Sequence, residues 1–241
     1  MAGAAAKDVL LLADEHNLTS FLNEASIERD RLALDTSVFG QDSKTFIVDT
    51  KDAMVSFGGL ADETATGISK ILDDAEGQAQ VVVTYGLQDS FESYAYLLDA
   101  AESEIGRDAS ISGLLRINGV YKAQEDGGDS GVILLPVTTA TATADGSGHD
   151  RGAANTSSGG NVCHLHVTAA SGTTPTLDVT VEMDTNSGFS TPTTLATFTQ
   201  ATTTTSERIE NTTSTERYVR VSYTIGGTTP SFTFAVSWAP R

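Results

Sequence analysis

Two histidines on one short segment are the residues best placed to do chemistry in this chain. His164 and His166 are two positions apart, so in an extended strand both imidazoles project from one face, while Cys163 points to the other. Protein-bound zinc usually has three or four ligands, and no further histidine lies close to this pair in the sequence. The pattern therefore favours an exposed pair of strand side chains over a metal site.

Acidic turns are the second set of candidate ligands. The segment Asp184 to Gly188 is similar to the opening of a calcium loop, but Leu195 stands where such loops carry a bidentate Glu. A hairpin turn accounts for this segment better. The pair Asp73-Asp74 and the segment Asp126 to Asp129 could attract divalent cations, yet they are more typical of a solvated helix end and an acidic turn. We predict no metal ligand and no cofactor.

Motifs for catalysis are missing from the sequence. It has no phosphate-cradling glycine loop, no Gly-x-Ser-x-Gly elbow and no His-Glu-x-x-His helix. Cys163 lies in an apolar strand-like segment, which is typical of a buried and inert thiol. Trp238, Tyr218 and Tyr223 could stack on sugars, but Trp238 continues an apolar stripe and is expected in the core. We predict no catalytic residue and no enzyme activity.

Charge is distributed unevenly along the 241 residues. Residues 1–145 carry 25 acidic and 9 basic side chains, a net charge of −16, whereas residues 146–241 carry 7 and 5, a net charge of −2. Phosphate binding needs clustered Lys and Arg, so the acidic part argues against a surface that holds nucleic acid. The hydrophobic content of 39% is enough for a folded protein, and the single cysteine excludes an intrachain disulfide.

Neither a signal peptide nor a membrane span is predicted. The apolar run Val9 to Ala13 is short and is flanked by acidic residues, and no apolar stretch approaches the roughly 20 residues that cross a bilayer. We therefore expect synthesis in the cytoplasm without membrane insertion.

A change of composition divides the chain near residue 148. The stretch 136–160 passes from Thr/Ala alternation to Gly/Ser-rich sequence, which is typical of a connector. This predicts an acidic domain over residues 1–148 and a second domain over residues 149–241. Turn signals at 186–188 and 226–227 separate three alternating runs, so we expect a small antiparallel β-sandwich there. The apolar members of the runs are Leu177, Val179, Val181 and Met183; Val219, Val221, Tyr223 and Ile225; and Phe232, Phe234, Val236 and Trp238.

The first domain is expected to be mainly β with helices beside the strands. Apolar residues at helical spacing predict one helix over residues 66–76, ended by Gly77, and a second over residues 89–104, ended by Gly106. The apolar faces of both helices indicate core packing. Candidate strands lie at residues 45–48, 53–57, 80–85, 111–117 and 131–136.

Several short motifs follow one another in a characteristic order over residues 8–135. They are Asn17 to Asn23, the strand-like Ile27 to Leu34, Asp35 to Gly40, Phe57 to Leu60 before the first helix, Val81 to Gly86, and Asp129 to Leu134. In order and spacing they resemble the tail tube proteins, or major tail proteins, of long-tailed bacteriophages with non-contractile tails. The resemblance covers about half of the chain and rests on short motifs.

The resemblance implies a fold and an assembly. Residues 1–148 would form a tail-tube-like β-sandwich or barrel with a flanking helix, and residues 149–241 an immunoglobulin-like or jelly-roll-like β-sandwich that decorates the exterior of the tube. Subunits would form homohexameric rings that stack into the virion tail and guide DNA during ejection without binding it specifically. The implied partners are further copies of the chain and the tail initiator, tape-measure and terminator proteins.

The residues add a physical argument and leave alternatives open. An acidic wall would let duplex DNA slide, although salt screens the effect beyond about 8 Å. The segments 41–44 and 49–52 are candidate contacts between rings, if they become ordered on stacking. The alternatives are another virion structural protein, such as a capsid or decoration protein, and a carbohydrate-binding or adhesion module that meets host-surface glycans through residues 149–241.

Overall fold

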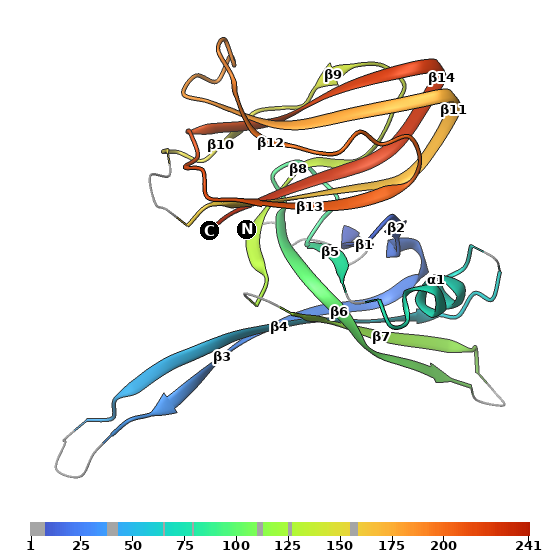
Figure 1. Cartoon of the computed structure of the whole chain (residues 1–241). Coiled ribbons are helices and arrows are strands. Elements are labelled where there is room, and N and C mark those ends of the chain that lie inside the picture. The colour runs from blue at the N-terminus through green and yellow to red at the C-terminus, as the bar shows by residue number, and fades with distance from the viewer. Residues whose placement is uncertain are drawn as a thin grey trace. The chain divides into compact units, whose positions relative to one another are not determined.

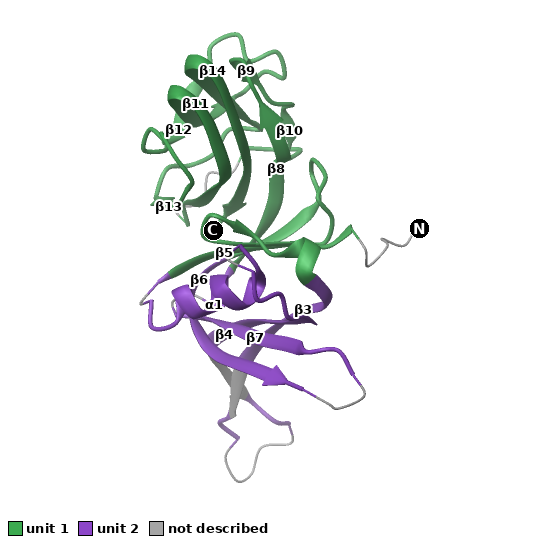
Figure 2. Cartoon of the chain, turned by 90° about the vertical axis from the view of Figure 1, so that its right-hand side faces the viewer, with its two compact units in different colours: residues 1–21, 81–97, 129–241 green, residues 22–80, 98–128 purple. Residues whose placement is uncertain are grey.

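The chain is mainly β, as expected, in a computed structural model that describes residues 8–37, 43–64, 66–78, 80–109, 113–124, 127–154 and 159–241 (Figure 1). The contacts between residues divide it into two compact units (Figure 2). Unit 1 comprises residues 1–21, 81–97 and 129–241, and unit 2 comprises residues 22–80 and 98–128. No helix in the described ranges is long and apolar enough to cross a membrane.

The expected boundary near residue 148 stays a prediction, and the compact units follow a different division. Strands β8 (Asp129–Ala140) and β9 (Ala144–Asp145) precede that boundary, yet both pair with β14 (Tyr218–Pro240). Strand β6 (Tyr94–Asp108) passes from unit 1 to unit 2 at residue 98.

Unit 1 is organised around one long pair of antiparallel strands. Strand β11 (Asn161–Asp184) pairs with β14 from the register Asn161↔Pro240 to the register Asp184↔Tyr218, and the two strands curve together (Figure 1). The remaining elements of unit 1 are β1 (Leu10–Ala13), β2 (His16–Asn17), the 3-10 helix η2 (Thr19–Phe21), β5 (Val81–Gly86), β10 (His149–Asp150), β12 (Thr193–Thr197) and β13 (Thr205–Asn211).

A glycine in each long strand lets the pair bend without ending. Gly172 has a φ of 122° and Gly227 a φ of 109°, values that side chains other than glycine rarely adopt. Each of these glycines is the first residue of a Gly-Thr-Thr-Pro sequence, and Thr173 pairs with Thr228 across the bend. The expected turn at residues 226–227 is therefore wrong: bulges there shift the register while pairing continues on both sides.

The alternating runs of the sequence form the core of unit 1, as predicted. Val179, Val221 and Phe234 are at most 1% exposed. Trp238 is also 1% exposed, and its indole N–H donates to Asn161 Oδ1 over 3.0 Å. A buried indole needs such a partner, so the expected core position of Trp238 is confirmed.

Unit 2 is a four-stranded sheet with one helix. Strands β3 (Leu22–Asp35), β4 (Phe46–Leu60) and β7 (Arg116–Ala123) pair in this order, and β7 also pairs with residues 100–108 of β6. The rings of Phe57 and Tyr121 stack at 5.3 Å in the core. Gly119 makes room for the Phe57 ring, because a Cβ there would lie 2.3 Å from the ring's Cζ.

Helix α1 (Ile68–Ala75) confirms the first predicted helix. Ile68, Leu72 and Ala75 are buried, as their spacing predicts, and Gly77 has a φ of 80° just beyond the last turn. Within the described residues α1 is the only α-helix.

The second predicted helix, over residues 89–104, is wrong. Bends and a turn occupy residues 87–92, and Tyr94 begins strand β6. Leu97 and Leu98 point to opposite faces of β6, and both are fully buried. Because both faces are covered there, the apolar residues form a continuous run, which periodicity does not separate from a buried helix.

Other strand boundaries differ more modestly from the expectations. The candidate strands at 45–48 and 53–57 are parts of one strand, β4, and those at 80–85 and 131–136 correspond to β5 and β8. The strand expected over residues 111–117 begins only at Arg116, and residues 111–112 lie outside the described part. The last three residues of the motif Asp35 to Gly40 also lie outside it.

Candidate functional site

One face of the unit 2 sheet is exposed and acidic. Residues that pair directly in antiparallel strands share a face, so the register places alternate residues of β3, β4, β7 and β6 on the face opposite the Phe57 ring. We call this the acidic face. Its exposed charged residues are Glu24, Glu28, Asp30, Asp52, Glu104 and Asp108, against Arg116 and Lys122.

Most carboxylates of the acidic face form no ion pair with another described residue. Lys122 Nζ lies 3.1 Å from Asp52 Oδ2, which pairs one of the two cations. Asp108 accepts a hydrogen bond over 3.1 Å from the side-chain amide of Asn118, which carries no charge. The side chains between the acids are polar, such as Ser26 and Ser56, or apolar, such as Met54, Val120 and the exposed Leu60. The excess of carboxylates on this face repels phosphate.

Helix α1 belongs to the opposite face of the same sheet (Figure 2). Arg107 of β6 pairs with Asp73 of α1 and lies on that face. The side chain of Glu102 also lies there, and neither of its carboxylate oxygens has a hydrogen-bond partner in the described structure. Burial, with the nearby charges of Glu76 and Asp73, raises the pKa of Glu102 to about 7, and Arg107 only partly opposes this.

Replacing Glu102 with Gln is expected to stabilise unit 2 above pH 7. The unfolded chain releases the Glu102 proton near pH 4.5 and the folded chain near pH 7, so this group makes unit 2 less stable as the pH rises between these values. Amide hydrogen exchange of β7 should be slower in Glu102→Gln than in the wild type at pH 8, with little difference at pH 4.5. Glu104→Gln, on the exposed face of the same strand, should leave exchange unchanged; equal effects of the two variants would contradict the assignment.

The acidic face is bordered by a long strand edge. Among the described residues β3 (14 residues) pairs with β4 alone, so no described strand pairs with its other edge. An open edge of this length is a surface for strand pairing with another chain. The interpretation of residues 49–52 as a segment that becomes ordered on stacking is wrong, because they lie in β4 and Asp52 pairs with Asp30. Of residues 41–44, only Ser43 and Lys44 lie in the described part.

The two histidines singled out in the sequence form part of a buried polar network in unit 1. Their imidazoles lie on one strand face with ring centroids 5.9 Å apart. The interpretation as an exposed pair is wrong, because both side chains are fully buried. β11 is covered on this face by β5, from which Thr84 Oγ1 contacts His164 Nδ1 at 3.1 Å, His166 Nε2 at 2.9 Å and Ser237 Oγ at 3.1 Å. The sequence pattern of β11 alone does not reveal that another strand packs over this face.

The network fixes where its protons lie. His166 Nδ1 is 2.7 Å from the carbonyl oxygen of Asp14, which only accepts, so Nδ1 carries the proton and Nε2 accepts from the Thr84 hydroxyl. Thr84 then accepts from His164 Nδ1 and from Ser237. This leaves His164 Nε2 with a lone pair and no partner among the described residues.

Burial keeps both imidazoles neutral. Desolvation lowers the pKa of His166 to about 4, and it lowers the pKa of His164 well below its ordinary value, with further contributions from His166 and Arg208. The arrangement of hydroxyl and imidazole is that of a nucleophile and a base, but Thr84 is 1% exposed and no substrate reaches it. The network therefore belongs to the buried interior of unit 1.

The other candidate ligand groups are dispersed or engaged in structure. No cluster of three or more His, Cys, Asp or Glu that could hold a metal occurs in the described ranges. Cys163 is buried, as predicted, and burial raises the pKa of its thiol to about 12. Asp184 accepts hydrogen bonds from the backbone of Asn186 and Thr191, which confirms the expected hairpin turn. Asp74 pairs with Lys70 on the surface of α1, and Asp126 lies outside the described part.

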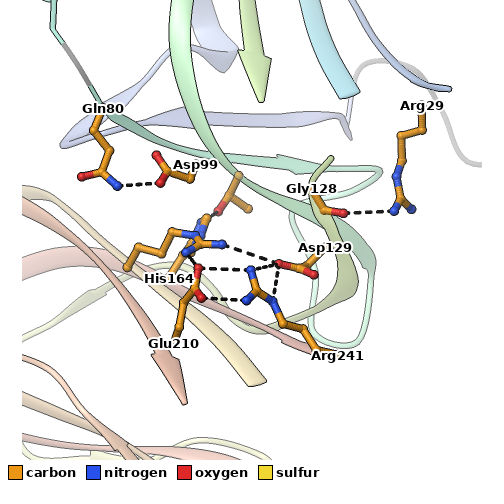
Figure 3. A network of polar contacts seen from close by, with 10 residues as sticks. Arg29, Gln80, Asp99, Gly128, Asp129, His164, Glu210 and Arg241 are labelled. Carbon is orange, nitrogen blue, oxygen red and sulfur yellow. Dashed lines mark hydrogen bonds and ion pairs between the residues drawn. The ribbon is translucent and has the colours of Figure 1, made fainter. Parts of the chain in front are cut away.

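Sequence reasoning missed an ionic cluster in unit 1 (Figure 3). Arg241 donates to Asp129 Oδ2 over 3.1 Å and to both carboxylate oxygens of Glu210. Arg208 pairs with the same two acids. These residues come from β8, β13 and the residue that follows β14, so only the fold brings them together. The cluster links Arg241 to β8 through Asp129 and to β13 through Glu210.

No protein-family model matches the sequence, and no curated protein sequence matches it. Several solved structures are similar in fold. A chain of the virion of a native gene transfer agent particle matches 51% of this chain and 95% of its own length, with 12% identity and a TM-score of 0.41. A chain from the tail of an empty gene transfer agent particle with C6 symmetry gives the same coverage and identity, with a TM-score of 0.40.

A third similar structure extends over nearly the whole chain. The Dit protein of phage SPP1, described as a hub adsorption apparatus of phages that infect Gram-positive bacteria, matches 95% of this chain and 98% of its own, with 12% identity and a TM-score of 0.35. These structural neighbours are components of virions or tails. At such identities and TM-scores the likenesses assign neither a family nor a function to this chain.

Proposed function

We propose that the chain is a structural subunit of a phage tail, and specifically a tail tube subunit that assembles into stacked hexameric rings. The observation that carries the proposal is the acidic face of unit 2, a four-stranded sheet face without a helix, bordered by the open edge of β3. The order of motifs over residues 8–135 supports the same assignment. Residues 149–241 would decorate the exterior, and no catalytic step is involved.

In this proposal the acidic face lines the lumen. Neighbouring subunits would pair at strand edges that have no strand partner within one subunit, such as that of β3, and this would close the sheets into a barrel. The helix side of the sheet would then face outward. Glu24, Glu28, Asp30, Glu104 and Asp108 would repel passing DNA, so the tube would guide DNA without holding it. Contacts within a ring would be heterologous, and stacked rings would stay open-ended until another protein caps them.

Electron microscopy of the purified full-length chain tests the assembly. Concentrated protein in negative stain is expected to show rings or hollow tubes. Closed shells would instead assign the chain to another part of the virion, and a purely monomeric protein at all concentrations and salt levels would contradict self-assembly.

A charge reversal tests which face lines the lumen. Tubes of Glu28→Lys should retain short duplex DNA in a co-sedimentation assay at low salt, because the new cation is repeated in every subunit along the channel. Wild-type tubes should retain little. Asp178→Lys makes the same charge change at an exposed position of unit 1 and is the matched control. Equal DNA retention by both variants would contradict the assignment of the acidic face to the lumen.

A further inference from the structure

A groove in unit 1 contains an arginine, Arg151, that pairs with no carboxylate among the described residues. The groove has a volume of about 440 Å³ and lies among residues of β6, β8, β10 and β14. The Arg151 guanidinium stacks 5.0 Å from the centre of the Trp238 ring. Its Nη1 atom is buried and has no hydrogen-bond partner in the described structure. In a chain of net charge −18, an unpaired half-buried arginine is unusual and requires an explanation.

The acids of the groove already have other partners. Asp150, the residue before Arg151, accepts two hydrogen bonds from Arg217, over 2.8 Å and 2.7 Å. Glu92 Oε1 lies 2.9 Å from His149 Nδ1. No described residue therefore accepts a hydrogen bond from Nη1 of Arg151. Burial lowers the pKa of Arg151 but leaves the group a cation at neutral pH.

We propose that this groove binds the carboxylate of an acidic sugar, a hexuronate unit of a polysaccharide, through the Arg151 guanidinium. A carboxylate in the groove would pair with the guanidinium charge, for which the described residues supply no acid, and bonds between charged groups are stronger than neutral ones. The groove has the size of an ordinary small-ligand site.

The other walls of the groove fit a sugar ring. The side chain of Tyr94 is 67% exposed at the groove and offers an aromatic face, on which the C–H groups of a pyranose can pack. Ser130 and His149 supply polar groups for hydroxyls. A peptide strand fits less well, because β8 is paired on both sides here: Val132 pairs with Tyr94 of β6 and with Trp238 of β14.

The groove is also held in place before any ligand arrives. The amide of Arg151 donates to the carbonyl of Arg217 over 3.0 Å, next to the Asp150 ion pair. Gly131 brings β8 close to β14, since a Cβ there would lie 2.0 Å from the carbonyl oxygen of Trp238. A preformed site loses less entropy on binding. The inference concerns unit 1 alone and does not depend on the tail tube role.

Calorimetric titration of the full-length chain with methyl glucuronide and with methyl glucoside, at physiological ionic strength, tests the proposal. The acidic sugar should bind and its neutral counterpart should bind at least about tenfold more weakly, as expected for the loss of a charged hydrogen bond. Arg151→Gln should remove this difference. Arg31→Gln, an exposed arginine of unit 2 that does not line the groove, should preserve it.

Further measurements keep the outcome decisive. Tyr94→Ala changes an exposed side chain, so it should fold normally and still weaken binding of the acidic sugar. Absence of binding by the wild type, equal binding of both sugars, or unchanged binding by a folded Arg151→Gln variant would overturn the proposal. Acetate that binds as tightly as the glucuronide would overturn the sugar assignment.

Discussion

Replacement of Trp238 by alanine is expected to lower the free energy of unfolding of unit 1 by about 3 to 5 kcal/mol. The side chain is 1% exposed and lies in the core of unit 1 beside the pairing of β11 and β14. Alanine would leave a large cavity, and Asn161 Oδ1 would lose the indole donor at 3.0 Å. Urea unfolding followed by far-ultraviolet circular dichroism measures the change, since the variant has no tryptophan fluorescence.

Two variants separate the contributions of Trp238. Trp238→Phe keeps most of the volume and removes the hydrogen bond, so its loss should be clearly smaller than that of the alanine variant. Tyr94→Ala removes an exposed ring and should change the stability by less than about 0.5 kcal/mol. A loss in Trp238→Ala no larger than that in Tyr94→Ala would contradict the core position of the indole.

Unit 1 is expected to lose about 3 kcal/mol of stability between pH 6.5 and pH 4 through His166 alone. The pKa of this imidazole is 6.5 in the unfolded chain and about 4 in the folded protein. In this interval the unfolded chain binds a proton that the folded protein does not, so stability falls as the pH falls and levels off below pH 4. The physical cause is burial, which disfavours the charged imidazole; the hydrogen bond from Nδ1 to the Asp14 carbonyl oxygen opposes this shift only in part.

Urea titrations at several pH values, followed by the fluorescence of Trp238, report on unit 1 and measure this slope. His166→Gln is expected to be less stable at pH 7 and to depend less on pH between 6.5 and 4. His16→Gln removes a more exposed imidazole and should keep the wild-type slope. Equal slopes in the wild type and in His166→Gln would refute a buried neutral His166.

Alternation predicted the strands of unit 1 well because it records which face is buried. Val179, Val221 and Phe234 lie where their period of two places them. It failed where both faces are buried, as at Leu97 and Leu98 of β6, because a continuous apolar run fits a helix equally well. The turn expected at residues 226–227 was wrong because glycines with a positive φ occur in β-bulges as well as in turns.

The candidate sites were harder to predict than the fold, because their partners are distant in sequence. The shared face of His164 and His166 followed from their spacing, whereas their burial depends on Thr84, some 80 residues earlier. The acidic face needs the register of four strands before Glu28 and Glu104 can be placed on one side. The sequence gives the net charge of the chain, but only the strand register shows which face of the sheet carries the acidic side chains.

The long pairing of β11 with β14 also determines when each part of the protein can fold during synthesis. The core of unit 1 joins β1, near the start of the chain, to β14, about 200 residues later. Unit 1 therefore stays open until β14 leaves the ribosome, and its folding is expected to be slow because its contacts are non-local. All strands of unit 2 lie between residues 22 and 123, so the acidic sheet is complete in sequence while half of the chain is still unmade.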